Sequence, residues 1–166
     1  MSLSVPMMSS NRLSRCFTTL RVKKRCGLIT FITAGDPDYQ TCLDILTSLP
    51  QAGADVIELG MPFSDPMADG PAIQLSSQRA LKAGADMHQT FRLVSELRRM
   101  NDETPLILMG YYNPIYRYGV DRFLKDAVDH GVDGLIVVDL PPEADGTMST
   151  CKEDGTRFYP SGNANH

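Results

Sequence analysis

The sequence contains no long apolar run, and this absence excludes several classes of protein. No stretch of the 166 residues approaches the ~20 consecutive apolar residues that a helix needs to cross a bilayer. Residues 1–10 also lack the basic-then-apolar order of a secretory signal. We therefore expect a soluble cytoplasmic protein, preceded by a disordered extension over residues 1–10.

Cysteine spacing typical of a metal site is missing as well. The four cysteines lie far apart, and none belongs to a C-x-x-C pair. This pattern predicts free thiols in a reducing compartment and no metal site.

The sequence also has no excess of basic residues. It has 16 Lys and Arg against 20 Asp and Glu, which gives a formal net charge of −4. A mild acidic balance argues against nucleic acid or an anionic membrane as the main partner. Apolar residues make up 42% and charged residues 22%, as is ordinary for a globular domain.

Short apolar segments and helical patterns alternate along the chain. Strands are predicted at residues 27–35, 56–60, 105–112 and 135–140, and helices at 12–24, 39–52, 72–83, 87–100 and 120–130. Pro114 is interpreted as a breaker after the third strand. Strands that alternate with helices predict parallel βα units, four of them here.

Two architectures accommodate four βα units, and the pattern does not choose between them. One is a doubly wound sheet, and the other is the first half of a (β/α)₈ TIM barrel. No G-x-G-x-x-G motif follows the first strand, which weakens the case for a dinucleotide-binding sheet.

One acidic side chain falls inside a predicted strand. Glu58 lies between Ile57 and Leu59, so it faces the opposite side of the sheet from both. A carboxylate inside a buried strand is costly unless it is functional or paired with a neighbouring Arg or Lys. Both interpretations stay open on pattern alone.

A stiff loop with three prolines and two aspartates follows that strand, over residues 61–71. It could bring Asp69 close to Glu58 across one pocket, where two carboxylates in different environments can separate in pKa. Alternatively, Asp65 and Asp69 cap the following helix, which is locally the better interpretation.

The segment Glu58–Pro71, which reads E-L-G-M-P-F-S-D-P-M-A-D-G-P, closely resembles the signature of the tryptophan synthase alpha subunit. Three further segments resemble that family's first, third and fourth strand ends: Thr30–Asp38, Gly110–Pro114 and Asp139–Glu143. The resemblance runs from about residue 11 to about residue 150. It implies a (β/α)₈ TIM barrel and a lyase of tryptophan biosynthesis. The implied reaction is retro-aldol cleavage of indole-3-glycerol phosphate to indole and glyceraldehyde 3-phosphate.

The resemblance also implies roles for individual residues. Glu58 matches the family's catalytic glutamate, a general acid and base, and Asp69 matches the aspartate that binds the indole N–H. Phe31, Met109 and Tyr111 match positions that line the indole pocket, although each could equally be barrel core.

The same resemblance implies a partner. In the family, this subunit joins a beta subunit in an α₂β₂ heterotetramer, and the beta subunit carries the pyridoxal phosphate. No metal or cofactor is expected in this chain. Pro62 and Asp65 lie in the segment similar to the family's contact and closing loop, so we expect them to act in partner contact or loop movement.

The resemblance ends after four strands, so we expect a half barrel over residues 11–150 and a tail outside the family pattern over 151–166. No residue can be assigned to phosphate binding, and we predict open sheet edges and little or no lyase activity. The alternative function is an inactive fragment that at most docks a beta subunit.

The tail shows no strand pattern. We hypothesise a one-base frameshift, because one possible coding of residues 159–166, read one base later, gives Ile-Arg-Leu-Ala-Thr-Pro-Thr, which resembles the family.

Overall fold

The computed structural model describes residues 11–139 and 157–160. Its helices are α1 (Arg12–Val22), α2 (Tyr39–Ser48), α3 (Pro71–Lys82), α4 (Met87–Met100), α5 (Tyr112–Tyr118) and α6 (Val120–His130). Its strands are β1 (Ile29–Thr33), β2 (Val56–Gly60), β3 (Leu106–Gly110), β4 (Gly134–Val137) and β5 (Arg157–Pro160). Among the described helices, none is long and apolar enough to cross a membrane.

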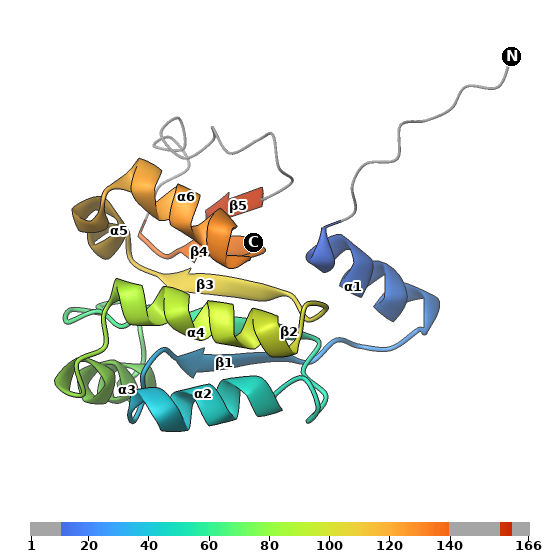
Figure 1. The fold of residues 1–166 in the computed structure, drawn as a ribbon, viewed down its shortest axis with the longest axis horizontal. Coiled ribbons are helices and arrows are strands. Elements are labelled where there is room, and N and C mark those ends of the chain that lie inside the picture. Colours follow the sequence, from blue (N-terminus) through green and yellow to red (C-terminus); the bar gives the residue numbers. More distant parts are fainter. Residues whose placement is uncertain (1–10, 140–156, 161–166) are drawn as a thin grey trace, which may run out of the picture.

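The strands form one parallel sheet whose spatial order equals their order in the chain, β1-β2-β3-β4-β5 (Figure 1). A doubly wound sheet would reverse its strand order at a switch point. This sheet has no such reversal over the described strands, so it is singly wound, as in a TIM barrel. The register pairs Glu58 of β2 with Phe31 of β1 on one side and with Ile107 of β3 on the other.

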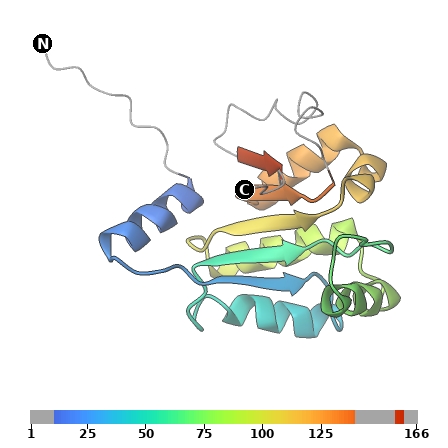
Figure 2. The same ribbon diagram turned by 180° about the vertical axis from the view of Figure 1, so that it is seen from behind.

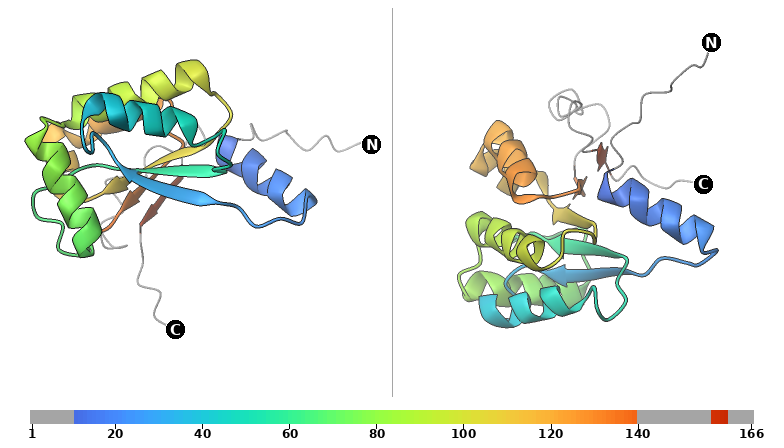
Figure 3. Two further views of the ribbon diagram at one scale, coloured as in Figure 1. Left: turned by 90° about the horizontal axis from the view of Figure 1, so that it is seen from below. Right: turned by 45° about the vertical axis from the view of Figure 1, so that its right-hand side comes forward.

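Helices α2, α4 and α6 lie next to one another on one face of the sheet (Figures 2 and 3). Their apolar sides pack on the strand side chains that point to that face, including Ile57 and Leu59, which are both 0% exposed. The alternate positions of the strands, such as Phe31 and Ile107, are only half-buried on the other face. The core therefore lies between the sheet and this helix layer.

Acidic side chains begin two of the three helices of this layer, α2 and α4. Asp38 accepts a hydrogen bond from the Thr41 backbone N–H at 2.9 Å, and Asp86 accepts one from Gln89 at 2.7 Å. Such N-caps each stabilise a helix by about 1 kcal/mol. They place the starts of α2 and α4 at the residues that the sequence predicts.

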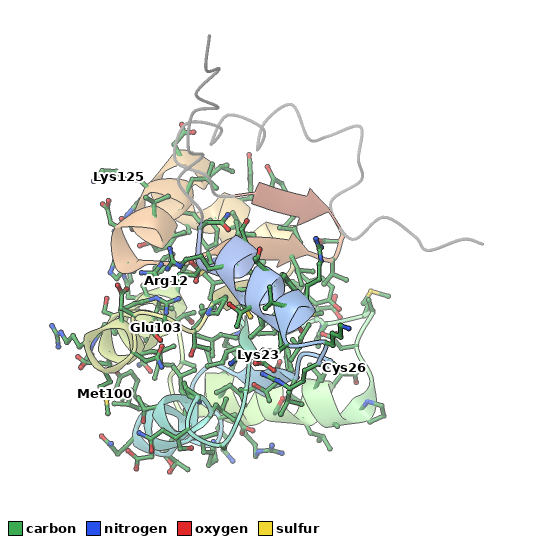
Figure 4. All side chains as sticks on the ribbon, turned by 90° about the vertical axis from the view of Figure 1, so that its right-hand side faces the viewer. Arg12, Lys23, Cys26, Met100, Glu103 and Lys125 are labelled. Carbon is green, nitrogen blue, oxygen red and sulfur yellow. The ribbon has the colours of Figure 1, made fainter. Side chains whose placement is uncertain are left out.

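The amino ends of β3 and β4 are held by a group of ion pairs that includes Arg12, the first residue of α1 (Figure 4). Asp133 accepts hydrogen bonds from Arg98 at 2.7 Å, from Arg12 at 3.0 Å and from the Leu106 backbone N–H at 2.8 Å. Arg12 also forms an ion pair with Asp102. The group connects α1, the end of α4 and the starts of β3 and β4.

The interpretation of Pro114 as a breaker is wrong, because Pro114 lies inside α5. It is the third residue of that helix, which begins at Tyr112. The first backbone N–H groups of a helix have no partner within the helix, so proline is tolerated in the first turn.

The expectation that the tail contains no strand is also wrong, because Arg157–Pro160 pairs with β4 in parallel register. Strand pairing uses backbone groups, which residues outside an apolar alternation can also supply. The remainder of the tail and the extension at 1–10 lie outside the described residues.

Candidate active site

Glu58 lies on the side of β2 that faces away from the helix layer. Its neighbours Ile57 and Leu59 are buried in the core, and Glu58 is half-buried among the inward positions of the sheet. Within the described part of the chain it forms no hydrogen bond or ion pair, so the alternative pairing with an Arg or Lys is not found there. Burial without a compensating charge raises the pKa of the Glu58 carboxyl.

A small pocket lies near the carboxyl ends of β1, β2 and β3. Its lining includes four of the predicted site residues, Phe31, Asp69, Met109 and Tyr111. The other lining residues are Thr33, Gly60, Met61, Phe63, Pro66, Ile73, Ser77, Gly110 and Val138. The free space inside is only about 10 Å³, no more than one water molecule occupies. A ring-sized ligand therefore enters only if lining side chains move.

Asp69 is held by Tyr111 from the end of β3. The Tyr111 hydroxyl donates a hydrogen bond to Asp69 Oδ2 at 3.2 Å and accepts one from the Ala68 backbone N–H at 2.9 Å. Burial, together with the negative charge of Asp69, raises the pKa of the Tyr111 phenol. Among the described residues, no donor contacts Asp69 Oδ1, so this oxygen is free to accept a ligand N–H.

The interpretation of Asp65 and Asp69 as helix caps is wrong. The N-cap of α3 is Gly70, which has no side chain to cap with, and Pro71 occupies the first helical position. Because Pro71 has no N–H, the first turn has one fewer donor that needs a cap. The Asp69 carboxylate instead accepts from Tyr111.

Two glycines give the pocket its shape, and sequence reasoning did not single them out. A Cβ at Gly60 would lie 2.5 Å from the Phe31 ring atom Cζ, and a Cβ at Gly110 would lie 2.9 Å from Met61 Cε. Each glycine ends a strand and leaves room for a side chain of the pocket. A glycine within a predicted strand often marks a close approach of another group, so the sequence could have pointed to Gly60 and Gly110.

The remaining predicted residues lie outside this pocket. Glu58 is not among its lining residues but is the register partner of Phe31, which is. Asp65 is exposed in the loop before α3. Pro62 lies in a neighbouring groove of about 460 Å³. The groove is lined by the loop after β2, the start of α4, and α5.

The described residues contain no group of three or more His, Cys, Asp or Glu side chains able to hold a metal ion. The candidate site instead offers the half-buried carboxyl of Glu58, whose pKa is raised, and the carboxylate of Asp69, which Tyr111 orients. Proton transfer and hydrogen bonding to a cationic or N–H group are the reactions that such a pair supports.

Comparison with known proteins gives consistent matches. The family model described as tryptophan synthase alpha chain matches residues 17–159. The structure of tryptophan synthase subunit alpha from Legionella pneumophila is 44% identical with a TM-score of 0.85, over 89% of this chain and 57% of that one. A tryptophan synthase from Mycobacterium tuberculosis is 32% identical with a TM-score of 0.85, over 92% and 61%.

A tryptophan synthase complex from Pyrococcus furiosus is also similar. It is 48% identical with a TM-score of 0.72, over 81% of this chain and 55% of that one. The chain thus spans between about half and two thirds of the length of these solved structures.

Proposed function

Because this chain belongs to the tryptophan synthase alpha chain family, we propose that its site serves the retro-aldol cleavage of indole-3-glycerol phosphate to indole and glyceraldehyde 3-phosphate. The observation that carries the proposal is one pocket lined both by Asp69, which Tyr111 orients, and by Phe31, the register partner of Glu58. An aromatic-lined pocket with one oriented carboxylate suits a flat ring that carries an N–H.

Glu58 is the proposed general acid and base. The cleavage needs a proton delivered to indole C3 and a proton removed from the glycerol hydroxyl. Burial raises the pKa of Glu58 towards neutral pH, which makes its protonated form easier to populate. A group that can both give and take a proton there is what this reaction requires.

Asp69 is the proposed partner of the indole N–H. As C3 is protonated, positive charge develops on the ring, and a carboxylate fixed beside the nitrogen stabilises that charge. The hydrogen bond from Tyr111 to Asp69 Oδ2 supports this role, because it leaves Oδ1 for the substrate. Phe31, Met109 and Tyr111 supply the apolar walls.

A beta subunit is the proposed partner, in an α₂β₂ assembly in the cytoplasm. The similarity to a tryptophan synthase complex from Pyrococcus furiosus supports it. In this proposal Pro62 and Asp65 belong to the contact loop, which fits the exposure of Asp65. Pyridoxal phosphate would then belong to the beta subunit, not to this chain.

A second candidate function is docking of a beta subunit without turnover. None of the residues that line the pocket is Lys or Arg, so no cationic side chain of its lining meets the phosphate of the substrate. Under this proposal the contact loop still binds the partner, while the chain releases no indole.

The test is release of indole from indole-3-glycerol phosphate by the purified chain, with and without a beta subunit. The variant is Glu58→Gln, and Glu96→Gln is the matched control, because Glu96 forms an exposed ion pair with Arg99 on α4. Loss of a general acid and base lowers the rate by about 10²- to 10⁴-fold. Release that Glu58→Gln abolishes and Glu96→Gln preserves supports the lyase. Partner binding without release supports docking, and absence of both contradicts the two proposals.

A further inference from the structure

Helix α3 has little apolar surface to hold it in place. It lies beyond the carboxyl end of β1 and outside the layer formed by α2, α4 and α6 (Figure 1). Its buried residues are small, Ser77 and Ala80, whereas Leu75 is 54% exposed. Because hydrophobic stabilisation scales with the apolar area buried, such a face fixes the helix weakly.

Two polar contacts connect α3 to the end of β1 and the loop after it. The side-chain oxygens of Thr33 and Ser76 lie 2.6 Å apart, and Thr33 is buried. The Ser76 hydroxyl already donates to the Ile73 carbonyl at 2.9 Å. The Thr33 hydroxyl is therefore the donor to Ser76.

The second contact is a bidentate ion pair between α3 and the loop after β1. Arg79 Nε donates to Asp36 Oδ1 and Arg79 Nη2 to Asp36 Oδ2, both at 2.8 Å. Parallel N–H···O bonds of this kind fix orientation as well as distance. Between the two contacts, a Cβ at Gly35 would lie 2.8 Å from the Cβ of Ala85, in the turn after α3, and 4.0 Å from the Cβ of Ala80 in α3.

The start of α3 in turn carries the pocket residues. Asp69 lies two positions before the first residue of the helix, and the Gln74 side-chain amide donates to the Asp69 carbonyl at 2.8 Å. Ile73 and Ser77 of the same helix line the pocket. A shift of α3 along β1 would therefore move Asp69 and one wall of the pocket together.

We propose that Thr33, Asp36, Ser76 and Arg79, here called the α3 clamp, are positioning residues that hold Asp69 in the pocket. The expected effect on an indole-bearing ligand rests on the proposed function, whereas the effect on the order of the loop does not. The Thr33 hydroxyl and the Asp36 carboxylate are not part of the β1–β2 ladder, which uses backbone groups. Their removal would loosen α3 and leave the sheet paired.

The test compares Thr33→Val, which keeps the shape but removes the hydroxyl, with Thr33→Ser, which keeps the hydroxyl. The readout is backbone amide exchange at Ala68, Asp69 and Gln74, whose N–H groups are hydrogen-bonded, together with the affinity for indole. A lost hydrogen bond accelerates local exchange by about three- to tenfold. We expect this for Thr33→Val and not for Thr33→Ser, with a similar loss of indole affinity.

A second pair of variants keeps the proposal testable if Thr33→Val fails to fold. Arg79→Ala should accelerate the same amides by about two- to fivefold, and the charge-swapped double variant Asp36→Arg/Arg79→Asp should restore them. Two outcomes overturn the clamp. One is an exchange rate at these amides that stays unchanged in Thr33→Val or Arg79→Ala. The other is an equal rise in exchange at Leu59 and Leu108 of the sheet. A parent chain that fails to bind indole counts against the proposed function, while the exchange data still decide the clamp.

Discussion

Arg98 and Asp133 form an ion pair of 2.7 Å although their side chains are only 10% and 4% exposed. Two further nitrogens of Arg98 also donate, Nε to the Gly131 carbonyl and Nη1 to the Thr104 carbonyl, each at 2.8 Å. Burial lowers the pKa of Arg98, and the charge of Asp133 opposes this effect. A buried, hydrogen-bonded ion pair is costly to break from one side only.

Asp133→Asn should therefore destabilise the protein strongly. It leaves the Arg98 and Arg12 cations without their shared carboxylate. We expect a loss of about 3–5 kcal/mol in the free energy of unfolding, measured by urea denaturation. The control is Asp129→Asn, which breaks an exposed pair with Lys125 and should cost less than about 1 kcal/mol. Equal losses in the two variants would contradict a special role for Asp133.

Glu58→Gln should stabilise the fold at neutral and alkaline pH. The pKa of Glu58 is raised by burial, so its stabilising contribution is complete below the unfolded-state pKa and is lost as pH rises through the folded-state pKa. The variant escapes this loss. Thermal melts should show Glu58→Gln above the parent at pH 8 and level with it at pH 4. A difference that does not change with pH would exclude this explanation.

Tyr111→Phe should loosen the loop before α3. The variant removes the hydroxyl that donates to Asp69 and accepts from the Ala68 N–H, at a cost of about 1–3 kcal/mol. We expect faster exchange of the Ala68 amide and weaker binding of indole. Tyr116→Phe, at an exposed position of α5, is the matched control and should change neither. An unchanged Ala68 exchange rate would show that the phenol does not order the loop.

Gly60→Ala should displace the Phe31 ring. The new Cβ would lie 2.5 Å from Phe31 Cζ, and overpacking of this kind costs about 1–3 kcal/mol. The cost should nearly vanish when Phe31→Ala is introduced first, because the clashing ring is gone. A double-mutant cycle of unfolding free energies measures this coupling. Strictly additive losses would mean that the clash lies elsewhere.

The sequence predicts most of the backbone plan because that plan depends on local periodicity, although it did not predict helix α5 and extended the third strand into it. The apolar run at residues 56–60 forms a strand with the predicted bounds. Helices α2 and α4 begin at the predicted residues, directly after their N-caps Asp38 and Asp86. The prediction of a TIM-barrel fold, which is confirmed, needed more than the sequence pattern, because four βα units fit two architectures. The strand order and the similarity to known alpha subunits decide between them.

One error arises because a contact between distant residues overrides local preference. Asp69 reads locally as a helix cap, but Tyr111, 42 residues away, takes its carboxylate. Pro114 resembles a breaker in sequence, but it lies in the first turn of α5. A backbone N–H there has no partner within the helix, so its absence in proline costs no hydrogen bond. The roles assigned to Glu58 and Asp69 stay predictions until the indole assay is done.

The anchoring of α1 has a consequence for the time course of synthesis. Arg12 finds its carboxylate partners Asp102 and Asp133 at separations of 90 and 121 residues. At about 5–20 residues per second, Asp133 is made roughly 6 to 24 s after Arg12. All the other described helices are complete by residue 130. Of the described helices, α1 is therefore made earliest, yet its pair with Asp133 cannot form until almost all of residues 11–139 have been synthesised.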